Sequence, residues 1–438
     1  MLLKFVLSNY RSFKDKATLD LEACSIKEHS ENVSFSKFGI QSVGVLKSIA
    51  LLGANTSGKS NLFKGFDVMR HMIINSARET ALTKTYHIEP FRLSTETEHK
   101  PTLFECSMIV DNIIYRYGFT CNNAAIISEW LYMTKKKREE TVFIRTKNEY
   151  EIVKYFPAHF KNKLMLLTDL TRNDALYLSV LTQFNIDMAI QISNWFAKNT
   201  VYSDPNIEEA ISYTAQLLAD PVYSSLFNEI IRKSDLGFNG VEKQMDKQEQ
   251  QLEYLGIGES PRPKIKLKAN HIKYDAKNRA VDKVFLELNK DESSGAQKLI
   301  ALLGPMIKVL LEGGIFWIDD FDAKIHPYII TMVMDLFNSE KCNHKGAQLI
   351  AISYNQQILK KLRRDQIVFL NKDAYGASSI TALYIFNPSV RSNAFFDKEY
   401  LQGQYGGVPN ISDVFNLDLK HNPGKNGTET AKKDAQLN

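Results

Sequence analysis

The sequence predicts an α/β protein whose core is split by a helical insertion. Apolar and polar residues alternate with a period of two in the first twenty residues and again between residues 101 and 145, which indicates strands. A buried strand, Ser48–Leu52, leads through a glycine-containing loop into a long amphipathic helix. Residues from about 155 to 260 are mostly helical and polar, and strands alternate with helices again after them.

The second half of the chain continues this alternation. Strands in "KIKLKANHIKYD" and "KVFLELNKDE" precede a helix from about Ala296 to Leu311 and a buried strand, Ile315–Ile318. A helix near Ile329–Asn338 and the strand "QLIAIS" follow, and "DQIVFLNKD" with "SSITALYIF" is predicted to close the sheet as a β-pair. No heptad pattern persists in the helical insertion, so a coiled coil is not predicted.

Changes in composition divide the chain into segments. Pro261 and Pro263 mark the end of the helical insertion, and the polar sequence after about His421 is predicted to be disordered. The expected segments are 1–150, the first half of the core; 151–262, the helical insertion; 263–415, the second half of the core; and 416–438, a disordered tail.

The bulk composition excludes several classes of protein. A hydrophobic content of 44% allows a sizeable core, and the net charge of +5 is compatible with nucleic acid without indicating it. Four well-separated cysteines with no CxxC pair indicate neither a disulfide framework nor a zinc site. The N-terminal apolar run is too short for a signal peptide, and no apolar run approaches the length of a membrane span. We therefore expect a cytoplasmic protein with no membrane partner.

The segment "GANTSGKS", Gly53–Ser60, fits the phosphate-loop pattern GxxxxGK[ST]. In such a loop backbone N–H groups at a helix start surround a phosphate, Lys59 reaches the β- and γ-phosphates, and the Ser60 hydroxyl is offered to Mg²⁺. The bare pattern arises by chance in a chain of this length about 1–2% of the time. The strand before it and the helix after it favour a triphosphate site over an ordinary glycine turn.

Two further stretches would complete such a site. The strand in "GIFWIDD" ends at Asp319, the candidate magnesium partner; taken alone, a strand end beside a turn explains it equally well. Upstream, "ESSGAQKL" places Ser294 and Gly295 at the start of an apolar helix, where the N-terminus attracts anions. Read alone, that serine is an ordinary N-cap. The phosphate loop in the same chain favours the ligand-binding interpretation of both stretches.

The order of phosphate loop, signature helix, acidic Walker B strand and switch strand resembles the ATP-binding-cassette class, which includes the heads of SMC and RecF proteins. The chain is more similar to the bacterial AAA-labelled ATPases related to the overcoming-lysogenisation-defect nucleases, which are often found in phage-defence systems. The resemblance covers most of residues 1–410. The stretches that carry it are "SNYRSFKDKATLDL", "GANTSGKSNLFKG", "PFRL", "SGAQKL", "IDDFDAKIHP" and "DKEYLQGQYGGVP".

This resemblance implies an ABC-type ATPase head with a mixed central sheet, an antiparallel β subdomain and a helical insertion. ATP and Mg²⁺ are the implied cofactors, and the chain would form a homodimer or higher oligomer through ATP-bridged heads. Asp322 would lie at the boundary between protomers, and Ser60 and Asp319 would hold the metal. The implied ATP-binding residues are Gly53, Asn55, Thr56, Ser57, Gly58, Lys59, Ser60 and Asn61, together with Ser294, Gly295 and Gln297 of the signature, which would touch ATP held by another protomer.

Two catalytic positions depart from the family pattern. Asp320 replaces the usual glutamate, so its carboxylate is set back by roughly 1 Å, and a misplacement of that size can cost about 100-fold in rate. Tyr354 in "AISYN" replaces the usual histidine, and a phenol with a reference pKa of about 10 is no base near neutral pH. The sequence therefore predicts tight ATP binding with slow hydrolysis to ADP and phosphate.

Three functional hypotheses follow. The first is an ATP-gated regulator in antiviral defence that holds a separately encoded effector, a nuclease or a toxin, because the chain shows no nuclease motif of its own. The second is a RecF- or SMC-like ATPase that clamps DNA. Basic runs such as Lys135–Arg138, Lys264–Lys268 and Lys360–Arg364 leave nucleic-acid binding open, although solvated strand or helix faces are the commoner explanation of such runs. The third is a scaffold that binds no nucleotide.

Overall fold

The computed structural model describes residues 1–38, 41–80, 83, 85–135, 137–152, 158–203, 207–244, 266–386 and 396–408. Within Met1–Gly407, which form one compact unit, the central element is a six-stranded sheet with the order β11-β15-β16-β5-β17-β18. Its strands are β5 (Ser48–Leu52), β11 (Thr200–Tyr202), β15 (Ile315–Ile318), β16 (Gln348–Ile352), β17 (Ile367–Lys372) and β18 (Ser378–Ala382).

Strand direction in this sheet positions the site. Strands β11, β15, β16, β5 and β17 are parallel, and β18 pairs antiparallel with β17, so the central sheet is mixed as predicted. Every residue of β5, β15 and β16 is buried, as expected for parallel strands covered on both faces. The carboxyl ends of parallel strands meet at one edge of a sheet, where ligands of open α/β folds bind.

A second, seven-stranded sheet is antiparallel throughout and has the order β10-β9-β8-β7-β6-β1-β2. The strands predicted near the N-terminus and between residues 101 and 145 agree with this sheet except for β10, which was not predicted, and the sheet is the predicted antiparallel β subdomain. The strands are β1 (Leu2–Ser8), β2 (Ala17–Asp20), β6 (Thr102–Val110), β7 (Ile113–Cys121), β8 (Ile126–Thr134), β9 (Glu139–Thr146) and β10 (Glu149–Ile152).

The stretch expected to be the helical insertion contains helices and also two strands. Strand β11 lies there and pairs in parallel with β15 of the central sheet, so this stretch contributes to the core. Strand β12 (Val241–Gln244) forms a three-stranded sheet with β13 (Lys266–Tyr274) and β14 (Ala280–Glu287). The helices are α2 (Ala158–Asp169), α3 (Tyr177–Gln183), α4 (Asp187–Ala197), α5 (Ile207–Leu217) and α6 (Pro221–Lys233).

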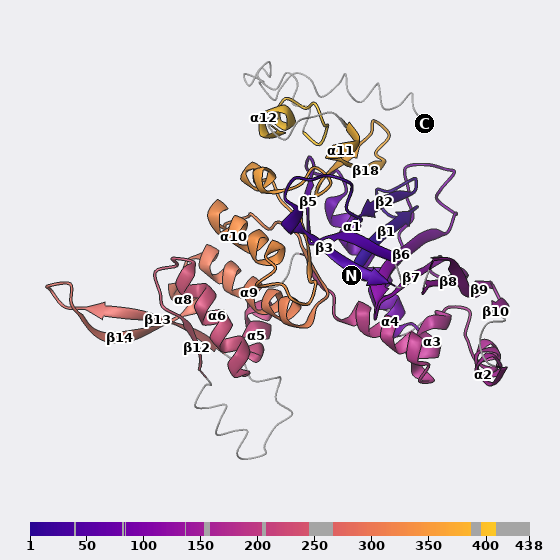
Figure 1. The fold of residues 1–438 in the computed structure, drawn as a ribbon, viewed down its shortest axis with the longest axis horizontal. Helices are drawn as coiled ribbons and strands as arrows, with labels where there is room; N and C mark the ends of the chain where they lie inside the picture. Colours follow the sequence, from indigo (N-terminus) through magenta and orange to yellow (C-terminus); the bar gives the residue numbers. More distant parts are fainter. Residues whose placement is uncertain are drawn as a thin grey trace, which may run out of the picture. The chain divides into compact units, whose positions relative to one another are not determined.

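The remaining elements connect and cover these sheets. Helix α1 (Lys59–Asn75) follows the phosphate loop, and α5 and α6 pack against α9 (Ser294–Glu312) (Figure 1). The others are the strand pair β3 (Val33–Phe38) and β4 (Gln41–Leu46), the 3-10 helices η1 (Ser30–Asn32) and η2 (Gln356–Lys361), and helices α8 (Leu288–Asp291), α10 (Pro327–Asn338), α11 (Leu383–Phe386) and α12 (Phe396–Leu401).

An aromatic cluster joins the two sheets behind the site. Trp317 of β15 is fully buried and stacks on Phe66 of α1 at 4.4 Å between ring centroids. Its ring also meets Phe63 and Phe5 edge-on, at 5.1 and 6.1 Å. Such aromatic pairs stabilise a fold by about 0.5–1.5 kcal/mol each beyond the apolar area that they bury. They fix the acidic strand relative to the helix that follows the phosphate loop.

Two expectations differ from the structure. The predicted strand in "SSITALYIF" ends at Ala382, because Ala382 pairs with Val368 near the start of β17 and few partner residues remain beyond it. Helix α9 is long and apolar enough to cross a membrane by length and composition, contrary to the sequence prediction, but 67% of its apolar window is buried inside the protein. The Pro261–Pro263 boundary and the 416–438 tail lie outside the described residues.

Candidate nucleotide-binding site

The phosphate loop joins the carboxyl end of β5 to the first turn of α1. Its backbone turns at Gly58, the helix N-cap, whose φ of 106° lies in the left-handed region that favours glycine. Within the described residues the Ser57 hydroxyl is buried without a hydrogen-bond partner. Asn55 and Thr56 are exposed, Ser60 and Asn61 are half-buried, and Gly53, Ser57, Gly58 and Lys59 are buried.

Lys59 is folded back onto its own loop. Its ammonium donates hydrogen bonds to the carbonyl oxygens of Gly53, at 2.6 Å, and Ala54, at 2.8 Å. Burial lowers the pKa of Lys59, and the nearby carboxylates of Asp319 and Asp320 partly oppose this shift. A hydrogen bond from an ammonium to an anionic phosphate is stronger than one to a neutral carbonyl, so a phosphate would compete well for Lys59.

The two aspartates lie at the same sheet edge but in different backbone conformations. Because β16 separates β15 from β5, Asp319 is two strands, or roughly 10 Å, away from the phosphate-loop strand. Its carboxylate accepts the N–H of Asp320 at 2.9 Å. Asp320 has a φ of 48°, a left-handed conformation in which Asp and Asn are much more common than longer side chains. The backbone therefore gives a reason for aspartate at position 320.

Tyr354 closes over the phosphate loop from the end of β16. Its hydroxyl donates to Asn55 Oδ1 at 2.9 Å, and its ring lies 4.9 Å from the Lys59 ammonium. Its backbone N–H and the Ser353 hydroxyl both donate to Asp322 Oδ2, at 2.5 and 3.1 Å. Burial raises the pKa of Tyr354, and the aspartates at the site raise it further, so the phenol stays neutral at physiological pH.

The signature residues lie on the other side of the acidic loop. The N-cap of α9 is Ser293, which accepts the Ala296 N–H at 3.2 Å, so the exposed Ser294 is the first helical residue. A Cβ on Gly295 would lie 2.5 Å from the Lys324 carbonyl oxygen, so only glycine fits against this loop. The Gln297 side chain donates back to the Glu292 carbonyl at 3.0 Å.

The N-termini of α9 and α10 open into one cavity of about 540 Å³, lined in part by Ser293, Gly295, Lys324 and His326. Lys298, one turn into α9, donates to the carbonyls of Asp320 and Ala323 and ties the signature helix to the acidic loop. The sequence reasoning did not single out Lys298. Its position directly after "SGAQ" was the available signal.

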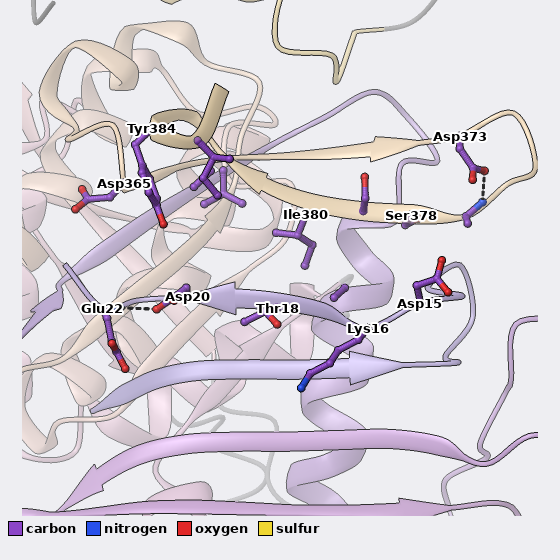
Figure 2. Close-up of a pocket in the computed structure, with 16 residues that line it drawn as sticks. Asp15, Lys16, Thr18, Asp20, Glu22, Asp365, Asp373, Ser378, Ile380 and Tyr384 are labelled. Atoms are coloured by element: carbon purple, nitrogen blue, oxygen red, sulfur yellow. Dashed lines mark hydrogen bonds between the residues drawn. The ribbon is translucent and has the colours of Figure 1, made fainter. Parts of the chain in front are cut away.

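A second cavity, of about 460 Å³, opens beside the phosphate loop between β2 and β18 (Figure 2). Figure 2 shows Asp20 and Glu22 at one end and Asp15 and Asp373 at the other. Carboxylates repel a triphosphate, so this cavity does not suit the phosphates. Among the described residues no group of three His, Cys, Asp or Glu side chains could hold a metal ion.

A family model described as "AAA domain, putative AbiEii toxin, Type IV TA system" matches residues 48–359. The chain belongs to this AAA family. The match covers the phosphate loop, the signature helix, the acidic strand and the switch strand. Together with the strand order, in which β16 separates the phosphate-loop strand from the acidic strand, it confirms the predicted ABC-type P-loop ATPase of the SMC and RecF kind.

Solved structures with a similar arrangement include the "SMC head domain from Thermotoga maritima", with 13% identity and a TM-score of 0.40 over 87% of this chain and 98% of that one. The SMC head bound to the C-terminal winged-helix domain of ScpA has 14% identity and a TM-score of 0.42 over 87% of this AAA protein and 97% of that chain. No curated protein matches the sequence.

Proposed function

We propose that this AAA ATPase binds Mg-ATP, hydrolyses it slowly and acts as a nucleotide-gated regulator or scaffold for a separately encoded effector, a nuclease or a toxin, in bacterial anti-phage defence. The observation that carries the proposal is the gathering of Lys59, Asp319, Asp320 and Tyr354 at one edge of the central sheet. The binding groups of a P-loop ATPase are present there, whereas both catalytic helpers are altered.

The residues at this edge fit a magnesium–triphosphate group. The phosphate loop offers backbone N–H groups at the start of a 17-residue helix, and the unpartnered Ser57 hydroxyl would gain a partner from a phosphate oxygen. Ser60 and Asp319 would hold Mg²⁺, which prefers oxygen ligands and keeps several waters when few come from protein. The metal would neutralise phosphate charge, while Lys59 would bind the β- and γ-phosphates.

Slow hydrolysis follows from the two altered positions. Asp320 would orient the attacking water from a shorter side chain than glutamate, and Tyr354 would donate one hydrogen bond but accept no proton. The Tyr354 hydroxyl donates to Asn55 of the phosphate loop. ATP would therefore hold one state of the protein for a long time.

The separation of the two phosphate-binding halves supports assembly through ATP. Gly295 lines a cavity beside the acidic loop and lies against Lys324 rather than the phosphate loop, and the exposed Ser294 is next to it in the chain. The dipoles of α9 and α10 would stabilise an anion there. A second copy of the chain would bring its own ATP to this cavity, so each nucleotide would be held between two protomers.

The family description names a toxin of a toxin–antitoxin system, which supports a role alongside a partner protein over a general DNA clamp. One observation favours the clamp: residues 266–287, the β13–β14 hairpin, carry six Lys or Arg against three Asp or Glu. A gel shift with duplex DNA that weakens steeply between low and physiological salt would support the clamp.

The test of the regulator is co-purification of the tagged chain with the proteins encoded beside it, with and without Mg-ATP. We expect one neighbour to be retained in an ATP-dependent manner and to be lost from the Lys59→Ala variant. Retention that ignores both ATP and Lys59 would contradict nucleotide gating. In parallel, single-turnover hydrolysis as fast as that of ordinary transporter ATPases would contradict slow turnover.

A further inference from the structure

We propose that Phe396–Gly407, which contains α12 and the glycine-rich turn after it, is a third part of the nucleotide site and holds the phosphate loop in its binding conformation through Tyr400. The motif "DKEYLQGQYGG" has no role in the function proposed above. This inference rests on that function, because it concerns ATP binding at the same loop.

Tyr400 connects the turn to the first residue of the phosphate loop. Its hydroxyl donates to the Gly407 carbonyl at 3.0 Å, in a buried contact. Burial raises the pKa of Tyr400, and the nearby Tyr354 raises it too, while a hydrogen bond from the Gly53 backbone N–H acts in the opposite direction. The phenol therefore donates to the turn and lies near the Gly53 backbone. It is 6% exposed, so water does not compete well for the bond to Gly407.

Gly407 lies directly on Gly53, the first residue of the phosphate loop. Its φ of 68° is left-handed, and a Cβ there would lie 3.3 Å from the Gly53 Cα and 3.4 Å from the Tyr400 ring. Gly53 is equally crowded on its other side, since a Cβ on it would lie 2.6 Å from the Leu370 carbonyl oxygen. The start of the phosphate loop is thus held between β17 and the turn.

An aromatic stack anchors the turn to the central sheet. The rings of Tyr400 and Tyr405 both stack on Phe369 of β17, each at 5.4 Å between centroids and at interplanar angles of 26° and 19°. Phe369 pairs with Leu52, the last residue of the phosphate-loop strand. The two tyrosines differ in their hydroxyls, because Tyr405 donates to Glu399 and does not reach the loop.

Positioning of Gly53 matters for ATP because Gly53 begins the phosphate loop and its carbonyl accepts a hydrogen bond from the Lys59 ammonium. A loop whose first residue is fixed on both faces presents its N–H groups in one geometry and loses less conformational freedom when phosphate binds. Removing the Tyr400 hydroxyl would loosen this end of the loop. Tyr400 acts through Gly53, so it is a positioning residue.

The test compares Tyr400→Phe with Tyr405→Phe in the full-length chain. Both variants keep the ring that stacks on Phe369, but only Tyr400→Phe removes a hydroxyl that bonds to Gly407, the residue that lies on Gly53. We expect Tyr400→Phe to weaken Mg-ATP affinity about five- to tenfold in a fluorescent-ATP titration, the effect of one lost buried hydrogen bond. Tyr405→Phe should leave the affinity within about twofold of wild type, even if its melting temperature falls by as much as that of Tyr400→Phe.

Affinity and stability together decide the outcome. Equal affinity in both variants, or equal weakening that follows the loss of melting temperature, would overturn the positioning role. The pair Gly407→Ala and Gly406→Ala repeats the comparison, since both glycines are left-handed but only Gly407 lies on Gly53. Loss of binding in Lys59→Ala with unchanged binding in Tyr400→Phe overturns this inference alone, whereas a wild-type chain that binds no ATP overturns the proposed function as well.

Discussion

The phosphate loop and the signature helix are both helix N-termini suited to phosphate, but the chain treats them differently. At the phosphate loop its own groups occupy the binding elements: Lys59 bonds to two loop carbonyls and Tyr354 bonds to Asn55. At the signature helix Ser294 is exposed and Gly295 lines a cavity. The first site is therefore tied by contacts within one chain, whereas under the proposed assembly the second would receive ATP carried by another chain.

The largest effect is expected at the phosphate loop. Lys59→Ala removes the ammonium that we propose binds the β- and γ-phosphates, so we expect Mg-ATP affinity to fall by more than about 100-fold, in line with the loss of a buried charge-assisted contact. The exposed Lys64, on the same helix, is the matched control, and Lys64→Ala should bind normally. Similar Mg-ATP titration curves for Lys59→Ala and Lys64→Ala would contradict a specific role of Lys59 in binding.

The second-largest effect is expected for Asp320→Ala, which should change ATP hydrolysis but not ATP binding. Asp320→Ala should lower single-turnover hydrolysis by about 100-fold, because it removes the carboxylate that we propose orients the attacking water. Its ATP affinity should stay within about threefold of wild type, because Asp320 accepts no contact from the phosphate loop. A binding loss as large as that of Lys59→Ala would show that Asp320 belongs to the binding groups instead.

Gly295→Ala tests the role of the signature helix. The added Cβ would lie 2.5 Å from the Lys324 carbonyl and push the acidic loop away from the signature helix. We expect the ATP-dependent dimer to weaken about tenfold in analytical ultracentrifugation, while each monomer still binds ATP, since a small backbone shift disturbs only the trans contact. Loss of ATP binding by the monomer would mean that the two sites are not separable.

The smallest effect near neutral pH concerns the charge of Lys59. Burial lowers the pKa of free Lys59, and bound phosphate favours the ammonium, so the pKa is higher in the complex. Binding then takes up a proton, and affinity falls as the pH rises through the free-state pKa, which lies below 10.5. Tyr354 stays neutral in this range because its pKa is raised. An ATP affinity that is constant up to pH 10 in calorimetry would contradict this.

The sequence located the strands that define the site and missed the contacts that close it. Ser48–Leu52 and Ile315–Ile318 agree with β5 and β15, because a phosphate-loop motif or a run of wholly apolar residues is a strong local signal. Strand β11 was missed, because three residues inside a helical stretch are too few to show the alternation of apolar and polar residues that marks a strand. Only its pairing with β15 makes this segment a strand.

Contacts between residues far apart in the sequence could not be predicted from local sequence patterns. The hydrogen bond from Tyr354 to Asn55 joins residues 299 positions apart, and no local rule places them together. Sequence comparison treated Asp320 as a shortened catalytic side chain. The left-handed backbone adds a second reason for aspartate, which spacing alone does not reveal. The role of position 320 is therefore set by the turn as well as by the chemistry.

The buried Trp317 gives this ATPase an intrinsic fluorophore at a useful place. The chain has three tryptophans, and Trp317 lies on the acidic strand against the helix that leaves the phosphate loop. Its indole N–H is buried without a hydrogen-bond partner among the described residues, so its emission should be blue-shifted and resistant to dissolved quenchers. Movement of the phosphate-loop helix against this strand would change that emission without any attached label.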